Sequence, residues 1–178
     1  MPKIITDLKA TILSVAQQDL LLEGYSALTI RNIAKKCNIA VGTMYNYYSS
    51  KEVLVAEILL EDWNNSLLIM QEESKKAQNM TDGLYRIFEE LRKFRKRYSD
   101  CWDQYTAQAN GNMEIKQRHY MLCNQISSII KELLLRLHIK PDDYLAEFTA
   151  EMLLTLSNDD SFKFSKLRGI IARLYTAN

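Results

Sequence analysis

The feature that most constrains the fold of this chain is its scarcity of helix-breaking residues. The 178 residues include only five glycines and two prolines, too few to supply the turns that a protein of many short strands needs. Apolar residues instead recur with helical spacing along almost the whole chain. Leu8, Ile12, Ala16 and Leu20 illustrate this pattern, because residues four apart share one face of a helix. No segment shows the alternation of a strand, so the sequence predicts an all-α protein.

Capping residues and breaks locate the expected helices. A first helix is capped by Thr6 or Asp7 and ends at Gly24, and a second helix begins after Thr29. Further helices are expected at residues 41–47, from Ser50 onward, and at 82–97, 100–109, 112–137, 142–157 and 160–175. We expect two domains, 1–51 and 52–178, joined by the helix that begins after Ser50.

Basic residues are concentrated at the N-terminus. The whole chain has a formal net charge of +1, but residues 1–51 hold six basic and three acidic residues, a net charge of +3, whereas the remainder carries −2. A basic N-terminal region on a mildly acidic remainder fits a polyanionic partner. The composition, 47% hydrophobic and 25% charged, is typical of a soluble globular protein.

Cysteine and histidine usage indicates neither a disulfide framework nor a metal centre. Cys37, Cys101 and Cys123 are odd in number and include no Cys-x-x-Cys pair, which favours the reducing cytoplasm. His119 and Cys123 could ligate a metal from one helix, but no second His/Cys pair lies near them. We therefore expect no metal and no cofactor. We find no signal peptide and no apolar stretch long enough to span a bilayer, and expect no membrane partner.

The most informative segment covers residues 29–54 and reads as a helix, a tight turn at Asn38 and a short helix. The short helix, at 41–47, is not stable alone, so the preceding helix must hold it and leave its outer face free to enter a major groove. That face carries Thr43, Tyr45, Asn46 and Tyr47. Hydroxyl and amide groups of this kind suit phosphates and base edges, and acidic residues are absent from 31–50. The segment predicts a DNA-binding helix-turn-helix.

This segment resembles the DNA-binding domain of the TetR family of transcriptional regulators, and the resemblance extends over residues 8–60. The matching positions are Thr29, Ile30, Arg31, Ile33, Ala34, Asn38, Ile39, Ala40, Gly42, Thr43, Met44, Tyr45, Tyr47, Tyr48, Lys51 and Leu54. Asn38 replaces the usual turn glycine, and Ala40 replaces a serine that would cap the second helix. The resemblance implies an N-terminal three-helix DNA-binding domain joined to a C-terminal helical domain for effector binding and dimerisation.

The resemblance implies that several of these residues face the bases. Arg31 is expected to contact guanine, with pairing to a phosphate or to Glu23 as the alternative. Thr43 is expected to contact a base or a phosphate. Val41 and Gly42 are small enough to meet a thymine methyl group or to let the backbone approach the DNA.

Other residues are expected on the phosphates. Tyr45 and Tyr47 would bind them through their hydroxyl groups, and Lys51 through its charge. Thr29 either combines a phosphate contact with helix capping or serves only as a cap, and Asn46 shares the outer face. Two residues of the same segment are expected in the core, namely Met44 and Tyr48.

In TetR-like proteins the C-terminal domain encloses a largely apolar effector pocket. The residues expected to line it here are Trp63, Leu67, Met70, Tyr85, Phe88, Trp102, Tyr105, Met113 and Tyr120, with ordinary core packing as the alternative for each of them. A basic run at the end of a helix comprises Arg92, Lys93, Arg95, Lys96 and Arg97. We expect this run to be a solvated face that complements the helix dipole, and the alternative is a site for an anionic effector such as a fatty-acyl derivative.

The last two helices carry apolar faces that are expected to form a four-helix dimer interface or, alternatively, part of a single core. These faces consist of Leu145, Phe148, Met152, Leu156, Leu167, Ile170, Ile171 and Leu174. The implied function is a transcriptional regulator, by family default a repressor, that binds palindromic operator DNA as a homodimer and is released by a small, largely apolar effector.

Two other functions are weighed against this one. The same fold can serve as an effector-independent DNA-binding protein with a nucleoid or cell-division role. An enzyme is not indicated, because the sequence has no Ser-His-Asp arrangement and no phosphate-binding glycine loop, and its two histidines leave little acid–base machinery.

Overall fold

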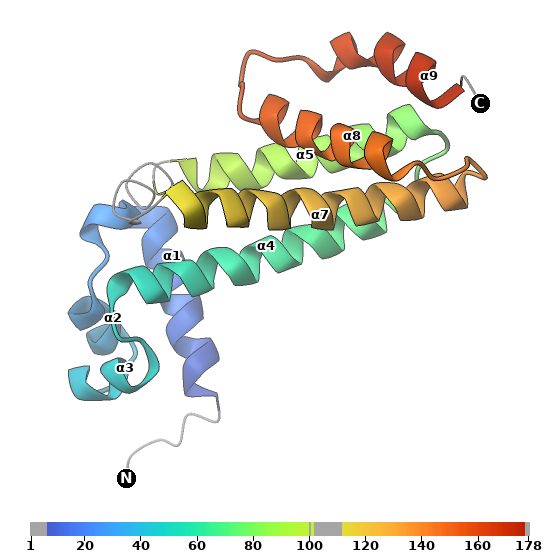
Figure 1. Ribbon diagram of the computed structural model, residues 1–178. Helices are drawn as coiled ribbons and strands as arrows, with labels where there is room; N and C mark the ends of the chain where they lie inside the picture. The colour runs from blue at the N-terminus through green and yellow to red at the C-terminus, as the bar shows by residue number, and fades with distance from the viewer. Residues whose placement is uncertain (1–6, 100, 102–111, 177–178) are drawn as a thin grey trace. The chain divides into compact units, whose positions relative to one another are not determined.

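The computed structural model describes residues 7–99, 101 and 112–176, and the regular elements in that part of the chain are all helical (Figure 1). The all-α prediction is therefore confirmed. The chain divides into two units: the first combines the residues up to Trp63 with the segment that starts at Arg97, and the second combines Asn64–Lys96 with the C-terminal segment. The division falls inside α4 (Lys51–Lys75). The functional boundary after residue 51 stays a prediction.

The first helix, α1 (Leu8–Ala27), is capped by Asp7, whose carboxylate accepts a hydrogen bond from the N–H of Ala10 at 3.0 Å. The sequence predicts that Gly24 ends this helix. Instead Gly24 introduces a kink, with φ 81° and ψ 171°, and a further short stretch follows. Glycine suits this left-handed backbone because it has no Cβ. The added stretch places Tyr25 in the core, where it is 2% exposed.

Three further helices belong to the first unit, namely α2 (Ile30–Lys36), α3 (Val41–Tyr47) and the N-terminal part of α4. Ser50 caps α4 as expected, because its hydroxyl accepts from the N–H of Val53 at 3.3 Å. All four helices contribute to the core of this unit. Its most deeply buried side chains include Ile12, Ala16, Ile33, Ala34, Met44, Leu54, Val55 and Ile58. The apolar positions that give the sequence its helical period thus hold α2 and α3 in place.

The second unit contains the rest of α4 and most of α5 (Met80–Arg97), followed by α7 (Asn112–Arg136), α8 (Asp143–Ser157), a 3-10 turn η1 (Phe164–Leu167) and α9 (Arg168–Thr176). Helices α7 and α8 pack side by side (Figure 1). The fully buried side chains include Leu84, Ile87, Phe88, Ile126, Ile130, Ala146, Ala150 and Leu153. Gly83 brings α5 close to α7, since a Cβ on this residue would lie 2.3 Å from Cδ2 of Leu133.

Helices α7 and α8 begin and end within one residue of the expected positions. Helix α5 starts two residues before the predicted range 82–97, because Asn79 is its cap. The side-chain oxygen of Asn79 accepts a hydrogen bond from the N–H of Asp82 at 2.9 Å. Capping by the residue one turn earlier therefore moves the start of the helix.

The predicted helix 160–175 is wrong in its first half. A regular α-helix begins only at Arg168, after η1. The carboxylate of Asp159 accepts from both the N–H and the hydroxyl of Ser161, at 2.9 and 2.7 Å. This local turn competes with helix formation. The predicted helix 100–109 lies outside the described residues, apart from Cys101.

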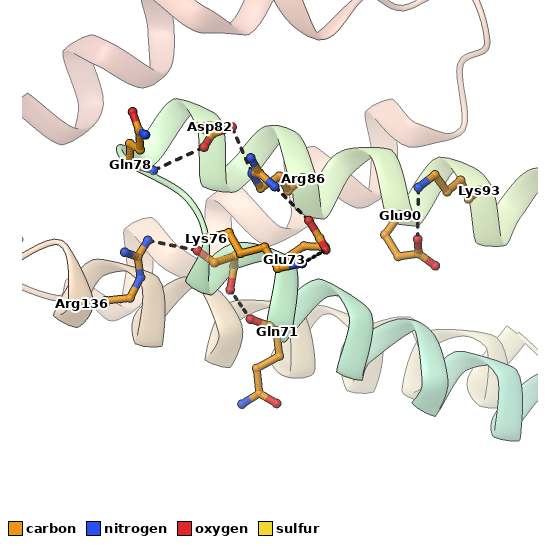
Figure 2. A network of polar contacts seen from close by, with 10 residues as sticks. Gln71, Glu73, Lys76, Gln78, Asp82, Arg86, Glu90, Lys93 and Arg136 are labelled. Atoms are coloured by element: carbon orange, nitrogen blue, oxygen red, sulfur yellow. Dashed lines mark hydrogen bonds and ion pairs between the residues drawn. The ribbon is translucent and has the colours of Figure 1, made fainter.

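Charged side chains hold the turn between α4 and α5 (Figure 2). The guanidinium of Arg86 binds Glu73 at 2.9 Å and Asp82 at 3.1 Å. Arg136 of α7 donates to the carbonyl of Ser74 in the last turn of α4, at 3.0 Å, and to the carbonyl of Ala77 in the turn that follows, at 2.6 Å. Among the described residues, no helix is both long and apolar enough to cross a lipid bilayer.

Candidate nucleic-acid interface

The turn between α2 and α3 depends on the left-handed backbone of Asn38, which has φ 55°. The N–H groups of Cys37 and Ile39 donate to the carbonyls of Ile33 and Ala34 at 2.9 and 3.0 Å. These bonds close the C-terminal end of α2 and direct the chain into the next helix. The expectation that Asn38 takes the place of the turn glycine is confirmed.

The two helices start differently. Thr29 caps α2, since its hydroxyl accepts from the N–H of Asn32 at 3.2 Å. Ala40 occupies the capping position of α3 and offers no side-chain hydrogen bond, which confirms the expected loss of the serine cap. The α3 helix, seven residues long, must therefore be stabilised by its packing.

That packing comes from the inner face of α3. Met44 and Tyr48 are both 0% exposed, so their expected place in the core is confirmed. Burial, followed by the nearby charge of Glu57, raises the pKa of Tyr48 above its ordinary value of 10.0 and keeps its hydroxyl neutral. The short helix is thus held by one apolar and one aromatic anchor.

The outer face of α3 is open. Tyr45 and Tyr47 are 54% and 43% exposed. The residues predicted to contact DNA are all exposed or half-exposed in the structure, namely Thr29, Arg31, Val41, Gly42, Thr43, Tyr45, Asn46, Tyr47 and Lys51. Their contacts with DNA stay predictions.

Arg31 lies exposed in the first turn of α2. In the described part of the chain it forms no ion pair, so the alternative pairing with Glu23 is not observed. No acidic residue lies between Arg31 and Ser50 in the sequence. A free guanidinium on a surface without acidic residues can take a bidentate acceptor such as a guanine edge or a phosphate.

One charged contact beneath this surface was missed by the sequence analysis. Asp19 of α1 is 8% exposed, and its carboxylate pairs with the ammonium of Lys36 at 2.5 Å. The pair fastens the C-terminal end of α2 to α1. The contact could have been found in the sequence from Asp19, because this charged residue lies on the otherwise apolar face that continues from Ala16 to Leu20.

Lys51, the first residue of α4, has internal partners. Its ammonium donates to the backbone carbonyl of Tyr25 at 2.6 Å and lies 3.9 Å from the centre of the Tyr25 ring. The hydroxyl of Tyr25 in turn donates to Glu52 at 3.5 Å. The phosphate contact expected of Lys51 stays a prediction, and these contacts give the residue a second possible role.

The described residues of the expected effector pocket differ in their surroundings. Met70 and Phe88 are fully buried and Leu67 is half-buried, whereas Tyr85 and Tyr120 are 45% and 69% exposed. Trp63, 4% exposed, belongs to the first unit. Three further members lie outside the described residues, namely Trp102, Tyr105 and the side chain of Met113.

A depression of about 250 Å³ lies on the second unit, along α4 and α5. Its lining includes Ile69, Glu73, Asp82, Tyr85, Arg86, Glu89, Glu90 and Lys93. Only Tyr85 comes from the predicted pocket set. The arginine of this lining is already neutralised by two of its carboxylates (Figure 2).

Tyr85 and Phe88 pack instead against the C-terminal segment. Each ring lies 5.3 Å from the ring of Phe164, centre to centre, and Phe88 lies 6.2 Å from Phe162. Phe162 and Phe164 were not among the predicted functional residues, because they fall where the sequence predicts an ordinary helix. The cluster connects α5 to the segment between α8 and α9.

The basic run at the end of α5 is the expected solvated face only in part, because Lys93, Lys96 and Arg97 are exposed whereas Arg92 and Arg95 are half-buried. Arg92 donates to the carbonyls of Asp160 and Phe162 at 3.1 and 3.4 Å. Arg95 donates to the carbonyl of Ser157 at 2.8 Å and pairs with the carboxylate of Asp160. Arg97, in the first unit, pairs with the buried Asp62. These guanidinium groups have internal acceptors, which explains their presence on a half-buried face.

The predicted dimer residues divide into three groups. Leu167 and Ile171 are 4% and 1% exposed and belong to the core of the second unit, so for them the alternative of a single core is correct. Phe148 and Ile170 are 58% and 50% exposed. The half-buried members are Leu145, Met152, Leu156 and Leu174.

The pair His119 and Cys123 has ordinary partners. The imidazole Nε2 lies 2.7 Å from the carboxylate of Glu151, and the thiol donates to the carbonyl of Glu147 at 3.7 Å. Burial raises the pKa of Cys123 to about 11. No group of three metal-binding side chains occurs among the described residues.

Comparisons with known proteins point to one family. Residues 12–58 match the bacterial regulatory proteins of the tetR family. Over 64 residues the chain is 31% identical to the HTH-type transcriptional regulator UidR of Escherichia coli (strain K12), and the match covers 36% of this chain and 33% of that protein. The chain thus spans about a third of the length of the curated relatives it matches.

Solved structures extend the likeness to nearly the whole chain. FadR of Bacillus subtilis in complex with stearoyl-CoA has a TM-score of 0.60 at 17% identity, covering 95% of this chain and 98% of that one. RolR without ligand has a TM-score of 0.62 at 16% identity, covering 94% and 90%. Identities this low show a shared fold. With the helix-turn-helix geometry and its sequence match, residues 12–58 are identified as a DNA-binding domain of the tetR family type.

Proposed function

We propose that this protein represses transcription by binding a palindromic operator as a homodimer, and that a small, largely apolar effector releases it. The observation that carries the proposal is the surface formed by α2 and α3. It combines an unpaired Arg31, exposed hydroxyl groups on Tyr45 and Tyr47, and no acidic side chain. A surface of this composition fits phosphates and base edges. A DNA partner also implies a cytoplasmic location.

Within that surface the residues have different tasks. Arg31 reads guanine, while Val41, Gly42 and Thr43 face the bases at the start of α3. The phosphates are bound by Thr29 at the start of α2 and by Tyr45, Asn46 and Tyr47 in the C-terminal half of α3. Phosphate contacts orient the protein, and base contacts select the sequence.

The dimer is formed by the exposed apolar side chains of α8 and α9. Phe148 and Ile170 are large apolar residues left in water by the single chain, and Tyr144 on α8 is 85% exposed. Exposed apolar side chains that gather on one surface mark an interaction site. Two copies also supply the two recognition helices that a palindrome needs.

The effector is apolar rather than anionic. Arg92, Arg95 and Arg97 have internal acceptors, so the basic run offers few free charges to an anion. The remaining candidates in the second unit are aromatic and aliphatic, such as Phe88 and Met70. Stearoyl-CoA, the ligand of the B. subtilis neighbour, is a suitable first probe because of its long apolar acyl chain, and CoA without the stearoyl group shows whether the anionic part alone acts.

The test begins with selection of duplexes from a random-sequence pool by the wild-type protein. We expect a palindrome, bound by a dimer, with log K falling against log salt by roughly 0.9 for each phosphate neutralised. Addition of effector should release the DNA, and operator and effector should weaken each other by the same factor. Salt-independent binding, or preference for single strands, would contradict the proposal.

A second candidate is an effector-independent DNA-binding protein of the same fold. The described residues of the expected pocket favour it, since Tyr120 is 69% exposed and the rings of Tyr85 and Phe88 both pack against Phe164. Footprinting across the genome separates the two functions. A regulator occupies one or a few promoters, whereas a nucleoid protein occupies many sites.

A further inference from the structure

Lys51 and Tyr25 form a contact at the base of the helix-turn-helix. The carbonyl of Tyr25 belongs to the short stretch of α1 that follows the kink at Gly24. The ammonium of Lys51 donates to this carbonyl at 2.6 Å and also covers the Tyr25 ring, 3.9 Å from its centre. The buried Tyr25 thus binds the ammonium of Lys51 through both its backbone carbonyl and the π face of its ring.

The dipole of α4 favours this arrangement. Lys51 is the first residue of α4, and a cation is disfavoured at the N-terminal end of a helix. The ammonium instead reaches the backbone carbonyl of Tyr25, whose oxygen carries partial negative charge. Glu52, beside it, accepts the hydroxyl of Tyr25 at 3.5 Å. Two consecutive residues of α4 therefore hold Tyr25.

The position of this contact in the chain matters. Tyr25 and Lys51 are 26 residues apart, and the segment between them contains α2, the turn at Asn38 and α3. Arg31 follows Tyr25 by six residues, and Tyr47 precedes Lys51 by four. The contact thus closes the helix-turn-helix at its base, and both ends of the proposed DNA surface continue directly from it.

We propose that Lys51 is a positioning residue for DNA binding: clamped on Tyr25, it fixes α2 and α3 in the geometry that DNA requires and does not itself neutralise a phosphate. An ammonium drawn to a phosphate would give up both its hydrogen bond to the Tyr25 carbonyl and its contact with the Tyr25 ring, and the loss of these two interactions opposes that movement. The inference rests on the proposed DNA-binding function and assigns this residue a role within it.

The test compares the wild-type protein with Lys51→Met, Lys51→Gln and Lys51→Arg. Lys75→Met is the matched control, because Lys75 ends the same helix and pairs only with Glu72 at an exposed site. The probe is the duplex selected by the wild-type protein, with dissociation constants measured over a series of KCl concentrations. Amide hydrogen exchange on the DNA-free proteins supplies a second readout at residues 30–47.

We expect Lys51→Met to weaken binding about ten- to a hundredfold, as loss of a charged hydrogen bond does, with the salt slope unchanged. Lys51→Gln keeps a donor without the charge and should lose less. Lys51→Arg should restore binding, and Lys75→Met should match the wild type. Exchange at residues 30–47 should accelerate in Lys51→Met and return to normal in Lys51→Arg.

A salt slope reduced by about 0.9 in Lys51→Met, with unchanged exchange, would show a direct phosphate contact and overturn the inference. So would undiminished DNA affinity. If Lys51→Met does not fold, Lys51→Gln carries the same comparison. If the wild-type protein selects no duplex, the proposed function fails instead, while the exchange experiment still decides whether Lys51 orders α2 and α3.

Discussion

We propose different roles for Arg31 and Tyr47, two exposed side chains of the surface formed by α2 and α3. Arg31 has a planar, forked guanidinium without an internal partner among the described residues, which suits it to the two acceptors of a guanine edge. Tyr47 offers a single hydroxyl at the far end of α3, which suits it to a phosphate. The chemistry of the side chains therefore separates selection of sequence from general affinity.

We expect Arg31→Ala to reduce discrimination at one operator position by about 1–3 kcal/mol, because a bidentate base contact is lost. Tyr47→Phe is the comparison variant and should weaken binding to every duplex alike. Competition assays with single-position operator variants measure both effects. Unchanged discrimination in Arg31→Ala would contradict the base contact.

Ala40 gives a prediction about stability. Because the capping position of α3 has no side-chain hydrogen bond, Ala40→Ser should raise the free energy of unfolding, by about 0.5–2 kcal/mol. Urea denaturation measures this change. Ala40→Val, which offers no acceptor, serves as the control and should bring no gain. Equal stability of Ala40→Ser and the wild type would show that the serine hydroxyl does not reach the helix N–H groups.

At the scale of elements, the sequence predicted well those helices whose caps and breaks lie next to their apolar period. Helices α7 and α8 fall within one residue of expectation, and the α2–turn–α3 segment was located through Thr29 and Asn38. The predicted start of a helix was wrong where a nearby side chain formed a local hydrogen bond with the backbone. Asn79 moved the start of α5, and Asp159 delayed the last helix by forming its own turn with Ser161.

The candidate site was predictable in part for the same reason. Its members lie close together in sequence, so a local pattern with the right spacing finds them. Contacts between distant segments left no such pattern: Arg95 reaches Ser157 and Lys51 reaches Tyr25 across 62 and 26 residues. Side-chain partners of this kind depend on packing, which periodicity does not specify.

The arginines of α5 support a prediction at this scale. Arg95→Met removes one hydrogen bond to the Ser157 carbonyl and the ion pair with Asp160, so we expect the segment between α8 and α9 to loosen, at a cost of about 1–3 kcal/mol. Hydrogen exchange at residues 157–167 measures the effect. Lys93→Met is the control, because Lys93 is mostly exposed and lies 3.8 Å from Glu90. Equal exchange in the two variants would show that Arg95 does not hold the segment.

For the whole molecule, the question is how one chain with a short recognition helix achieves useful affinity for DNA. A helix of seven residues reads only a few base pairs. Pairing two chains doubles the contacts, and the proposed interface on α8 and α9 provides for it. Affinity for a palindrome should therefore depend on residues that never approach the DNA.

We expect Phe148→Glu to dissociate the dimer and to lower affinity for the palindrome, because a charge replaces an apolar side chain at the proposed interface. Binding to a single half-site should change little. Sedimentation measures the mass, and Ile69→Glu, at an apolar residue on α4 that is 44% exposed, is the matched control. A Phe148→Glu protein that keeps its dimer mass would place the interface elsewhere.

The first unit is discontinuous in sequence, since the segment beginning at Arg97 belongs to it. A truncated protein that ends at Trp63 would lack Arg97, whose guanidinium pairs with the carboxylate of Asp62. Asp62 is only 8% exposed. Loss of a hydrogen bond between charged groups commonly costs about 1.5–3 kcal/mol, and less where one partner is in contact with solvent, as Arg97 is. A chimaera that transplants this DNA-binding module onto another sensor must therefore carry over two separate stretches of the chain.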